Sequence, residues 1–174
     1  KADLTAIGRK LQIRCPVLAC VVGLEEESGF RELVRRVGRK RATHQRFGKG
    51  THLWSTPSGK QLDAVCAHAC GAFEDWVYSL FREPEALSKP GNTKLYYLLC
   101  KIRRHLRQRL TNVLITGYGV DEKSAAQAEP FLFGGCYFAS AGESEDRQSF
   151  VKSVFEKLLD SEEELEWTEA ALAS

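Results

Sequence analysis

Some of the features that define large classes of proteins are absent from this sequence. It contains no methionine and only 5 prolines in 174 residues. No apolar run reaches the roughly 18 residues of a membrane-spanning helix, and no secretory leader is visible, so we expect a domain that lies in water. Residues 3–14 already have a helical pattern with Asp3 at its start, which predicts that the chain is a piece of a longer protein.

An excess of one charge is also absent overall, because the net charge is only +2, but the charges are unevenly distributed. Residues 1–60 carry 13 basic and 5 acidic side chains, residues 61–120 carry 8 and 5, and residues 121–174 carry 4 and 13. The apolar fraction of 43% is ordinary for a globular domain of this length. A basic front and an acidic end predict either neutralisation within the fold or partners of opposite charge.

The 6 cysteines do not form a secreted disulfide framework, because most of them lie inside apolar runs. We therefore expect reduced thiols in a reducing compartment. Cys66, His68 and Cys70 are spaced like metal ligands, but on a helix His68 points away from the face that the two cysteines share. The pattern favours two small core residues over a zinc site, and no motif supports a catalytic cysteine–histidine pair.

The hydrophobic pattern alternates between strands and helices, which is typical of a layered α/β fold. Residues 17–22 are continuously apolar and predict a strand that is buried on both faces, hence parallel to its neighbours. Residues 94–100 and 131–140 predict two further strands, the first of which could be an antiparallel edge.

Helices are predicted between these strands from the 3.6-residue period. They cover two to three turns from Ser28, about 61–81, about 102–114, and 146–160. Residues 48–60 are rich in glycine, serine and threonine and predict a loop. We expect one domain over residues 1–160 with a helical insertion at about 60–92, followed by an acidic helical end piece or tail at 161–174.

Two short motifs carry a family resemblance. Residues 16–30, PVLACVVGLEEESGF, align without a gap with PVYVVFTKADLVPGF, and the identities are Pro16, Val17, Gly29 and Phe30. Residues 134–144, GGCYFASAGES, are similar to RGVYFTSGTQEG, and the identities are Gly135, Tyr137, Phe138 and Ser140. The compared segments are those of IcmF/TssM-like proteins, the inner-membrane scaffold of type VI secretion, which this chain resembles over about residues 4–158.

The resemblance implies a partial GTPase-like (P-loop NTPase-like) fold with a mostly parallel sheet. It also implies a cytoplasmic location, as the soluble domain of an inner-membrane protein. In such folds the Asp of the TKAD element accepts hydrogen bonds from the guanine edge, and its Lys packs over the base. Gly23 stands here at the lysine position and Glu25 at the acid position, so the lysine is lost and the acid is one methylene longer.

The second motif supplies the other half of the base site in GTPases, a Ser-Ala-Lys loop whose backbone amide meets the base. Ser140 and Ala141 stand at these positions, followed by Gly142. The resemblance therefore leads us to interpret Gly23, Glu25, Ser140 and Ala141 as a vestigial, degenerate nucleotide-base loop.

A phosphate site is missing, because the sequence contains no G-x-x-x-x-G-K-[ST] element between a strand and a helix. Residues 48–54 and 58–61 share letters with this motif but lack its spacing. We interpret the chain as the back half of a GTPase-like domain without the phosphate-loop front half, and we expect no cofactor, no metal and no catalysis. The alternative is half of an active NTPase that upstream residues complete.

Two arginine-rich segments predict a basic interaction surface. Arg35 and Arg39 share one helix face with Arg36 beside them, and Arg103 and Arg107 share another. Such clusters contact nucleic-acid phosphates, acidic proteins or lipid headgroups, or they are simply solvated faces.

We favour a scaffold or interaction domain that binds protein partners in a membrane-associated secretion complex. It would reach the membrane only through regions outside this chain, and no small-molecule substrate is expected. A nucleic-acid-binding α/β module that uses the arginine clusters is the alternative.

Overall fold

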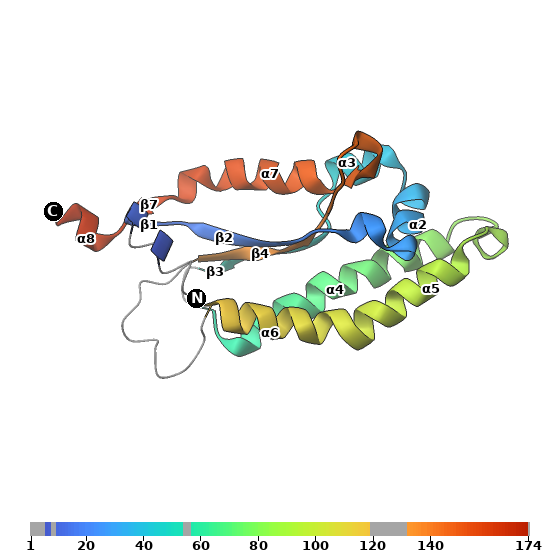
Figure 1. Ribbon diagram of the computed structural model, residues 1–174, viewed down its shortest axis with the longest axis horizontal. Helices are drawn as coiled ribbons and strands as arrows, with labels where there is room; N and C mark the ends of the chain where they lie inside the picture. Colours follow the sequence, from blue (N-terminus) through green and yellow to red (C-terminus); the bar gives the residue numbers. More distant parts are fainter. Residues whose placement is uncertain (1–5, 8–9, 54–56, 119–131, 174) are drawn as a thin grey trace.

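The computed structural model describes residues 6–7, 10–53, 57–118 and 132–173. A small sheet lies between helices on both of its faces (Figure 1). One face is covered by α7 (Val151–Asp160), and the other by α4 (Gly59–Phe81) and α6 (Arg107–Tyr118). The layered α/β class predicted from the alternating pattern is confirmed.

The central sheet has three strands in the order β2-β4-β3. β2 (Pro16–Val21) is parallel to β4 (Leu132–Phe138), whereas β3 (Gly48–Leu53) is antiparallel to it. The predicted strands near 17–22 and 131–140 and their parallel pairing are confirmed, but the sheet is mixed rather than mostly parallel. β2 is an edge strand with an exposed Cys20, so the prediction of burial on both faces is wrong.

The loop predicted over residues 48–60 is wrong in its first half, which forms β3. The glycines of this segment predicted a turn, but in the structure they allow neighbouring strands to pack closely. A Cβ atom on Gly50 would lie 2.6 Å from the Tyr137 hydroxyl, and one on Gly135 would lie 2.5 Å from the Lys49 carbonyl oxygen. Gly135 also has a φ of +134°, which other residues rarely adopt.

The long helix predicted at 61–81 is confirmed as α4. It begins with a capping box, in which the Gln61 N–H donates to the Ser58 hydroxyl at 3.3 Å and the Ser58 N–H donates to the Gln61 side chain at 2.8 Å. One face of α4 is directed at the core, and its buried residues include Leu62, Val65, Ala69, Phe73, Val77 and Leu80.

The strand predicted at 94–100 is wrong, since these residues form the helix α5 (Asn92–Lys101). Leu95 and Leu98 are buried while Tyr96 and Tyr97 are exposed, which is a helical rather than an alternating pattern. α5 continues through the π-turn η3 (Ile102–Leu106) into α6, as Figure 1 shows. The helical segment between β3 and β4 therefore extends beyond the expected insertion at 60–92.

The helix predicted from Ser28 is confirmed as α2 (Ser28–Val37), and α3 (Arg39–His44) follows it after Gly38. α2 packs closely on α5 because residue 29 has no side chain. A Cβ atom on Gly29 would lie 2.6 Å from the Lys94 carbonyl oxygen and 2.7 Å from the Leu98 Cβ.

Five phenylalanine rings form the centre of the core where α2, α4, β4 and the start of α7 meet. Phe47 lies in the middle of this cluster, with ring centroids 4.5 Å from Phe73, 5.0 Å from Phe150 and 5.9 Å from Phe138. The fifth ring, Phe30, lies 6.0 Å from Phe47. All five side chains are fully buried.

The two ends of the described chain meet in a short antiparallel ribbon, in which β1 (Ile13–Arg14) pairs with β7 (Glu166–Trp167). The helix predicted over 3–14 is therefore wrong at its end, where Gln12 has a φ of +52° and breaks it. Asp3, its predicted N-cap, lies outside the described residues. The acidic end piece consists of η5 (Ser161–Glu164), β7 and α8 (Glu169–Leu172).

The helix predicted at 146–160 begins only at Val151, because η4 (Glu145–Arg147) and β6 (Gln148–Ser149) occupy the preceding residues. Within the described part of the chain, no helix is both long enough and apolar enough to cross a membrane.

Candidate functional site

The turn that follows β2 is shaped by Gly23, which has a φ of +87° in the left-handed region. It leads into η1 (Leu24–Glu26), and Glu27 then caps α2 by accepting a hydrogen bond from the Gly29 N–H at 3.2 Å. A lysine at position 23 would be strained in this backbone conformation. The turn therefore suits glycine and not the lysine that the resemblance places there.

The turn that follows β4 forms a small hairpin in which β5 (Ser140–Ala141) pairs with β6. The parallel pairing of β2 and β4 brings this hairpin beside the first turn, and the Ala139 N–H donates to the Val21 carbonyl at 2.9 Å. Both predicted halves of the base loop thus lie at one edge of the sheet. The first half is Gly23 and Glu25, and the second half, Ser140 and Ala141, follows it by 115 or more positions in the sequence.

A direct hydrogen bond joins the two turns: the Ala141 backbone N–H donates to the Glu25 carboxylate at 3.3 Å. Next to it, the Arg147 guanidinium forms an ion pair with Glu26. The longer acid at position 25 is therefore already bonded to the amide of the opposite turn. Sequence reasoning placed both groups at one site but did not foresee that they would bond to each other.

The third acid of this turn connects it to the helical layer. Glu27 accepts a hydrogen bond from the Lys101 ammonium at 2.5 Å. Partial burial raises the pKa of the Glu27 carboxyl, but the hydrogen bonds from Lys101 and the Gly29 N–H outweigh burial, and the pKa is lowered overall. Glu27 is thus held ionised as a structural link between α2 and α5.

The first arginine cluster is paired with acids of this chain. Arg35 and Arg36 both bind the carboxylate of Glu32, at 2.7 and 2.8 Å. The Arg36 side chain is only 3% exposed, and it also donates to the Pro90 carbonyl at 2.7 Å and to Asn92 Oδ1 at 2.8 Å. Arg36 therefore fastens the loop before α5 to α2 and is not part of an exposed surface.

The other three predicted arginines are exposed and likewise paired. Arg39 binds Glu145 at 3.0 Å, Arg103 binds Glu74 through two bonds of 2.7 and 2.8 Å, and Arg107 binds Asp63 at 3.2 Å. The hydrogen bonds from Arg103 lower the pKa of Glu74. These pairs reduce the positive field that a nucleic-acid surface requires.

The cysteine and histidine constellation does not form a ligand set. In α4, Cys66 and Cys70 are buried whereas His68 is exposed, so the prediction of two core cysteines is confirmed. Burial, followed by the nearby Cys66, raises the pKa of Cys70 to about 11, which keeps this thiol protonated. Among the described residues, no three His, Cys, Asp or Glu side chains are grouped to hold a metal ion.

The sequence reasoning missed a cavity of about 460 Å³ on the other side of the β5–β6 hairpin, between α3 and the start of α7. Its residues come from α3 and from the stretch 145–152, two segments far apart in sequence, so no local spacing could have identified it. The carboxylate partners of the arginines were missed as well, although Glu32 lies three and four positions before Arg35 and Arg36, the spacing of paired charges on a helix.

No family model matches this sequence, and neither the curated proteins nor the solved structures contain a match to it. The fold and the site define the class of the domain: a layered α/β domain with a small mixed sheet and two facing turns at one sheet edge.

Proposed function

We propose that this chain is a non-catalytic scaffold or interaction domain, related in build to the back half of a GTPase-like fold. Its place would be in an IcmF/TssM-like component of a type VI-like secretion apparatus, as the sequence resemblance implies. The observation that carries the proposal is the hydrogen bond between Glu25 and the Ala141 N–H. It supports a degenerate base site, in which the acid of one turn accepts the hydrogen bond from the backbone amide of the other turn, so that neither group is left for a base.

In a nucleotide-binding GTPase the acid and the amide at these positions bond to the guanine base. Here a base would have to displace the Glu25 carboxylate from Ala141, which costs about 0.5–1.5 kcal/mol for an ordinary hydrogen bond, or at most about tenfold in affinity. That alone does not abolish binding. The missing lysine at Gly23 and the missing phosphate loop remove the remaining contributions.

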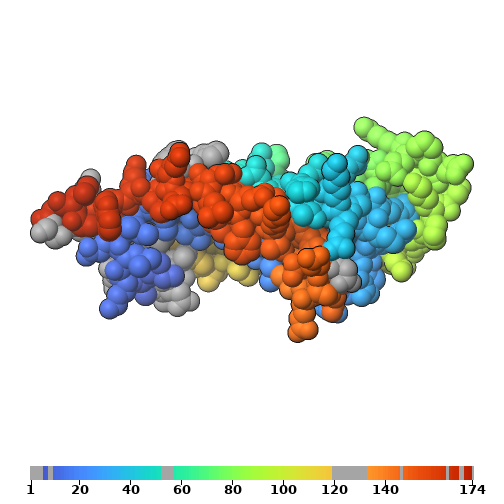
Figure 2. All heavy atoms as spheres, turned by 90° about the horizontal axis from the view of Figure 1, so that it is seen from above, coloured from blue at the N-terminus to red at the C-terminus, as the bar shows by residue number. Residues whose placement is uncertain are grey.

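A second feature supports a role in protein binding. The outer side of α7 exposes Phe155 and Leu159, which are 62% and 70% exposed and lie one helical turn apart, with Leu158 beside them. α7 also lies open to view in Figure 2, with no other element over the side of the helix that is seen there. Glu156 pairs with Lys152, but exposed acids without such a lysine, Asp160 and Glu163, stand at and beyond the end of the helix. We therefore propose a protein partner with an apolar face bordered by lysine or arginine on that side.

Calorimetric titration with GTP, GDP and ATP in the presence of Mg²⁺ tests the proposal. We expect no preference for guanine over adenine nucleotides, and the same titration in the wild-type protein and in Glu25→Ala. Micromolar binding of guanine nucleotides that Glu25→Ala abolishes would contradict the proposal, because it would show that the base loop works.

A further inference from the structure

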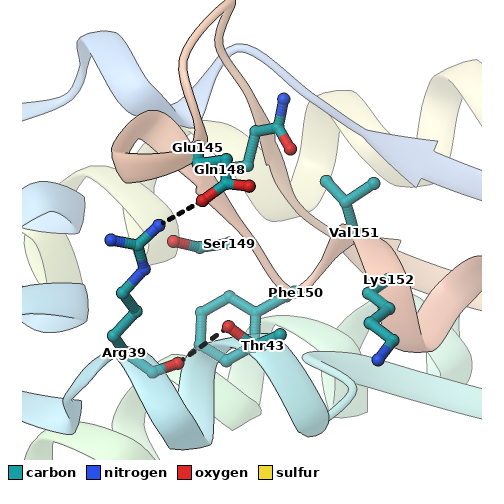
Figure 3. Close-up of a pocket in the computed structure, with 8 residues that line it drawn as sticks. All are labelled: Arg39, Thr43, Glu145, Gln148, Ser149, Phe150, Val151 and Lys152. Carbon is teal, nitrogen blue, oxygen red and sulfur yellow. Dashed lines mark hydrogen bonds and ion pairs between the residues drawn. The ribbon is translucent and has the colours of Figure 1, made fainter.

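The cavity beside the β5–β6 hairpin combines the start of α7 with polar side chains of α3 and of the hairpin. Its walls are formed by Arg39 and Thr43 of α3, Glu145 and Ser149 of the hairpin, and Val151 and Lys152 of α7 (Figure 3). None of the four residues proposed for the base loop lines it, although Ser149 pairs with Ser140 in the hairpin.

A buried hydroxyl points into this cavity. Ser149 is only 5% exposed, and Figure 3 shows its hydroxyl directed toward the guanidinium of Arg39. Among the described residues, no side-chain hydrogen bond is found for the Ser149 hydroxyl, and this oxygen is not one of the fully enclosed atoms without a partner, so it is reached from the cavity that Ser149 lines. By contrast, the neighbouring Thr43 hydroxyl donates to the Arg39 carbonyl at 2.9 Å. The Ser149 hydroxyl is therefore a donor, on an otherwise buried residue, that is available to a ligand in the cavity.

The start of α7 faces the same space. The helix is ten residues long and begins after Phe150, which has a φ of +63° and provides no side-chain cap. The N–H groups of a first helical turn lack acceptors within the helix, and the positive end of the helix dipole favours an anion. Val151 and Lys152 of this turn line the cavity.

Two positively charged side chains, Arg39 and Lys152, line the cavity. Arg39 pairs with Glu145 at 3.0 Å, and Lys152 pairs with Glu156 at 3.7 Å. All four side chains are at least half exposed, so both ion pairs are weak surface pairs. Since Glu145 also lines the cavity, its carboxylate stands where an anionic ligand would meet Arg39.

From these observations we infer that the cavity binds a phosphate group, either as free phosphate or as the end of a small phosphomonoester. Arg39 provides the planar, charged donor that suits two phosphate oxygens. Ser149 and the first turn of α7 donate to the remaining oxygens, and Lys152 adds positive charge at the other end of the cavity. Glu145 competes with the ligand for Arg39 and limits the affinity.

Titration of the ¹⁵N-labelled protein with inorganic phosphate, and separately with glycerol phosphate, tests this site at constant ionic strength with chloride as the balancing anion. We expect a dissociation constant of about 1 mM or lower and shifts of the Ser149, Val151 and Lys152 amides. Tighter binding of one ligand identifies the source of the phosphate group. No binding of either ligand beyond that of chloride would overturn the inference.

Four variants sharpen the test. Arg39→Gln is expected to weaken binding about tenfold or more, and Ser149→Ala about threefold to tenfold. Glu145→Gln is expected to tighten it about threefold. Lys40→Gln, which removes the neighbouring charge of α3 without touching the cavity, is the matched control. Equal losses in Arg39→Gln and Lys40→Gln would show unspecific attraction and overturn the site.

The experiments distinguish a wrong phosphate site from a wrong proposed function. A nucleotide bound through its phosphates at this cavity would bind regardless of its base and would be lost in Arg39→Gln. A nucleotide bound at the base loop would discriminate guanine from adenine and would be lost in Glu25→Ala.

Discussion

The substitution Glu32→Ala is expected to lower the free energy of unfolding by about 3–5 kcal/mol. The Glu32 carboxylate accepts hydrogen bonds from both Arg35 and Arg36, and the Arg36 side chain is almost fully buried. Removal of the carboxylate leaves the Arg36 charge buried without its counter-ion, which is much worse than the loss of a surface pair. Urea unfolding followed by circular dichroism measures the difference.

Glu156→Ala is the matched control, because Glu156 forms an exposed ion pair with Lys152. We expect it to change the free energy of unfolding by about 0.5 kcal/mol or less. The double variant Glu32→Leu with Arg36→Met, which removes both charges, should recover much of the stability that Glu32→Ala loses. A cost of Glu32→Ala no larger than that of Glu156→Ala would contradict the role assigned to this buried pair.

The same pair gives the effect of Glu32→Ala a defined pH dependence. Hydrogen bonds from Arg35, followed by those from Arg36, hold the folded-state pKa of Glu32 below its ordinary value of 4.5 in spite of burial. The ionised carboxylate therefore stabilises the fold above that value, and this contribution is lost as the pH falls through the folded-state pKa. The difference between wild type and Glu32→Ala should accordingly shrink in acid.

Phe47→Ala is expected to cost about 3–5 kcal/mol of unfolding free energy, the usual range for a buried phenylalanine. The Phe47 ring has four aromatic neighbours, of which Phe73 at 4.5 Å and Phe150 at 5.0 Å are the nearest. Those neighbours come from α4 and from the start of α7, on opposite faces of the sheet. The cavity left behind would loosen both layers at once.

Phe155→Ala is the control for Phe47→Ala, since Phe155 lies on the exposed side of α7. It removes the same ring but should change the stability by about 0.5 kcal/mol or less. Equal losses of stability in the two variants, measured by thermal and urea unfolding, would show that the ring cluster is not the centre of the core.

The residues that carry the family resemblance have structural tasks in this fold. Gly29 permits the close contact of α2 with α5, Phe30 belongs to the ring cluster, and Gly135 has a φ of +134° where β3 and β4 approach each other. These three identities are thus explained by packing.

The sequence predicted the elements whose signal is local. The strands β2 and β4, the helix α4 and the neighbourhood of Glu25 and Ala141 follow from apolar runs, caps and motif order. Glycine-rich β3 and the tyrosine-rich α5 were misread, because in both cases the deciding contacts come from distant residues. The cavity at Ser149 could not be foreseen for the same reason, since its walls meet only in the folded chain.

The amide of Ala141 offers the most direct test of the central claim, that the two turns at the sheet edge are closed on each other by Glu25. Its hydrogen-exchange rate and proton shift should be compared by NMR in wild type, Glu25→Ala and the control Glu26→Ala, which breaks only the neighbouring ion pair with Arg147. We predict faster exchange and an upfield shift of the Ala141 amide proton in Glu25→Ala alone. An Ala141 amide that is identical in wild type and Glu25→Ala would contradict the account.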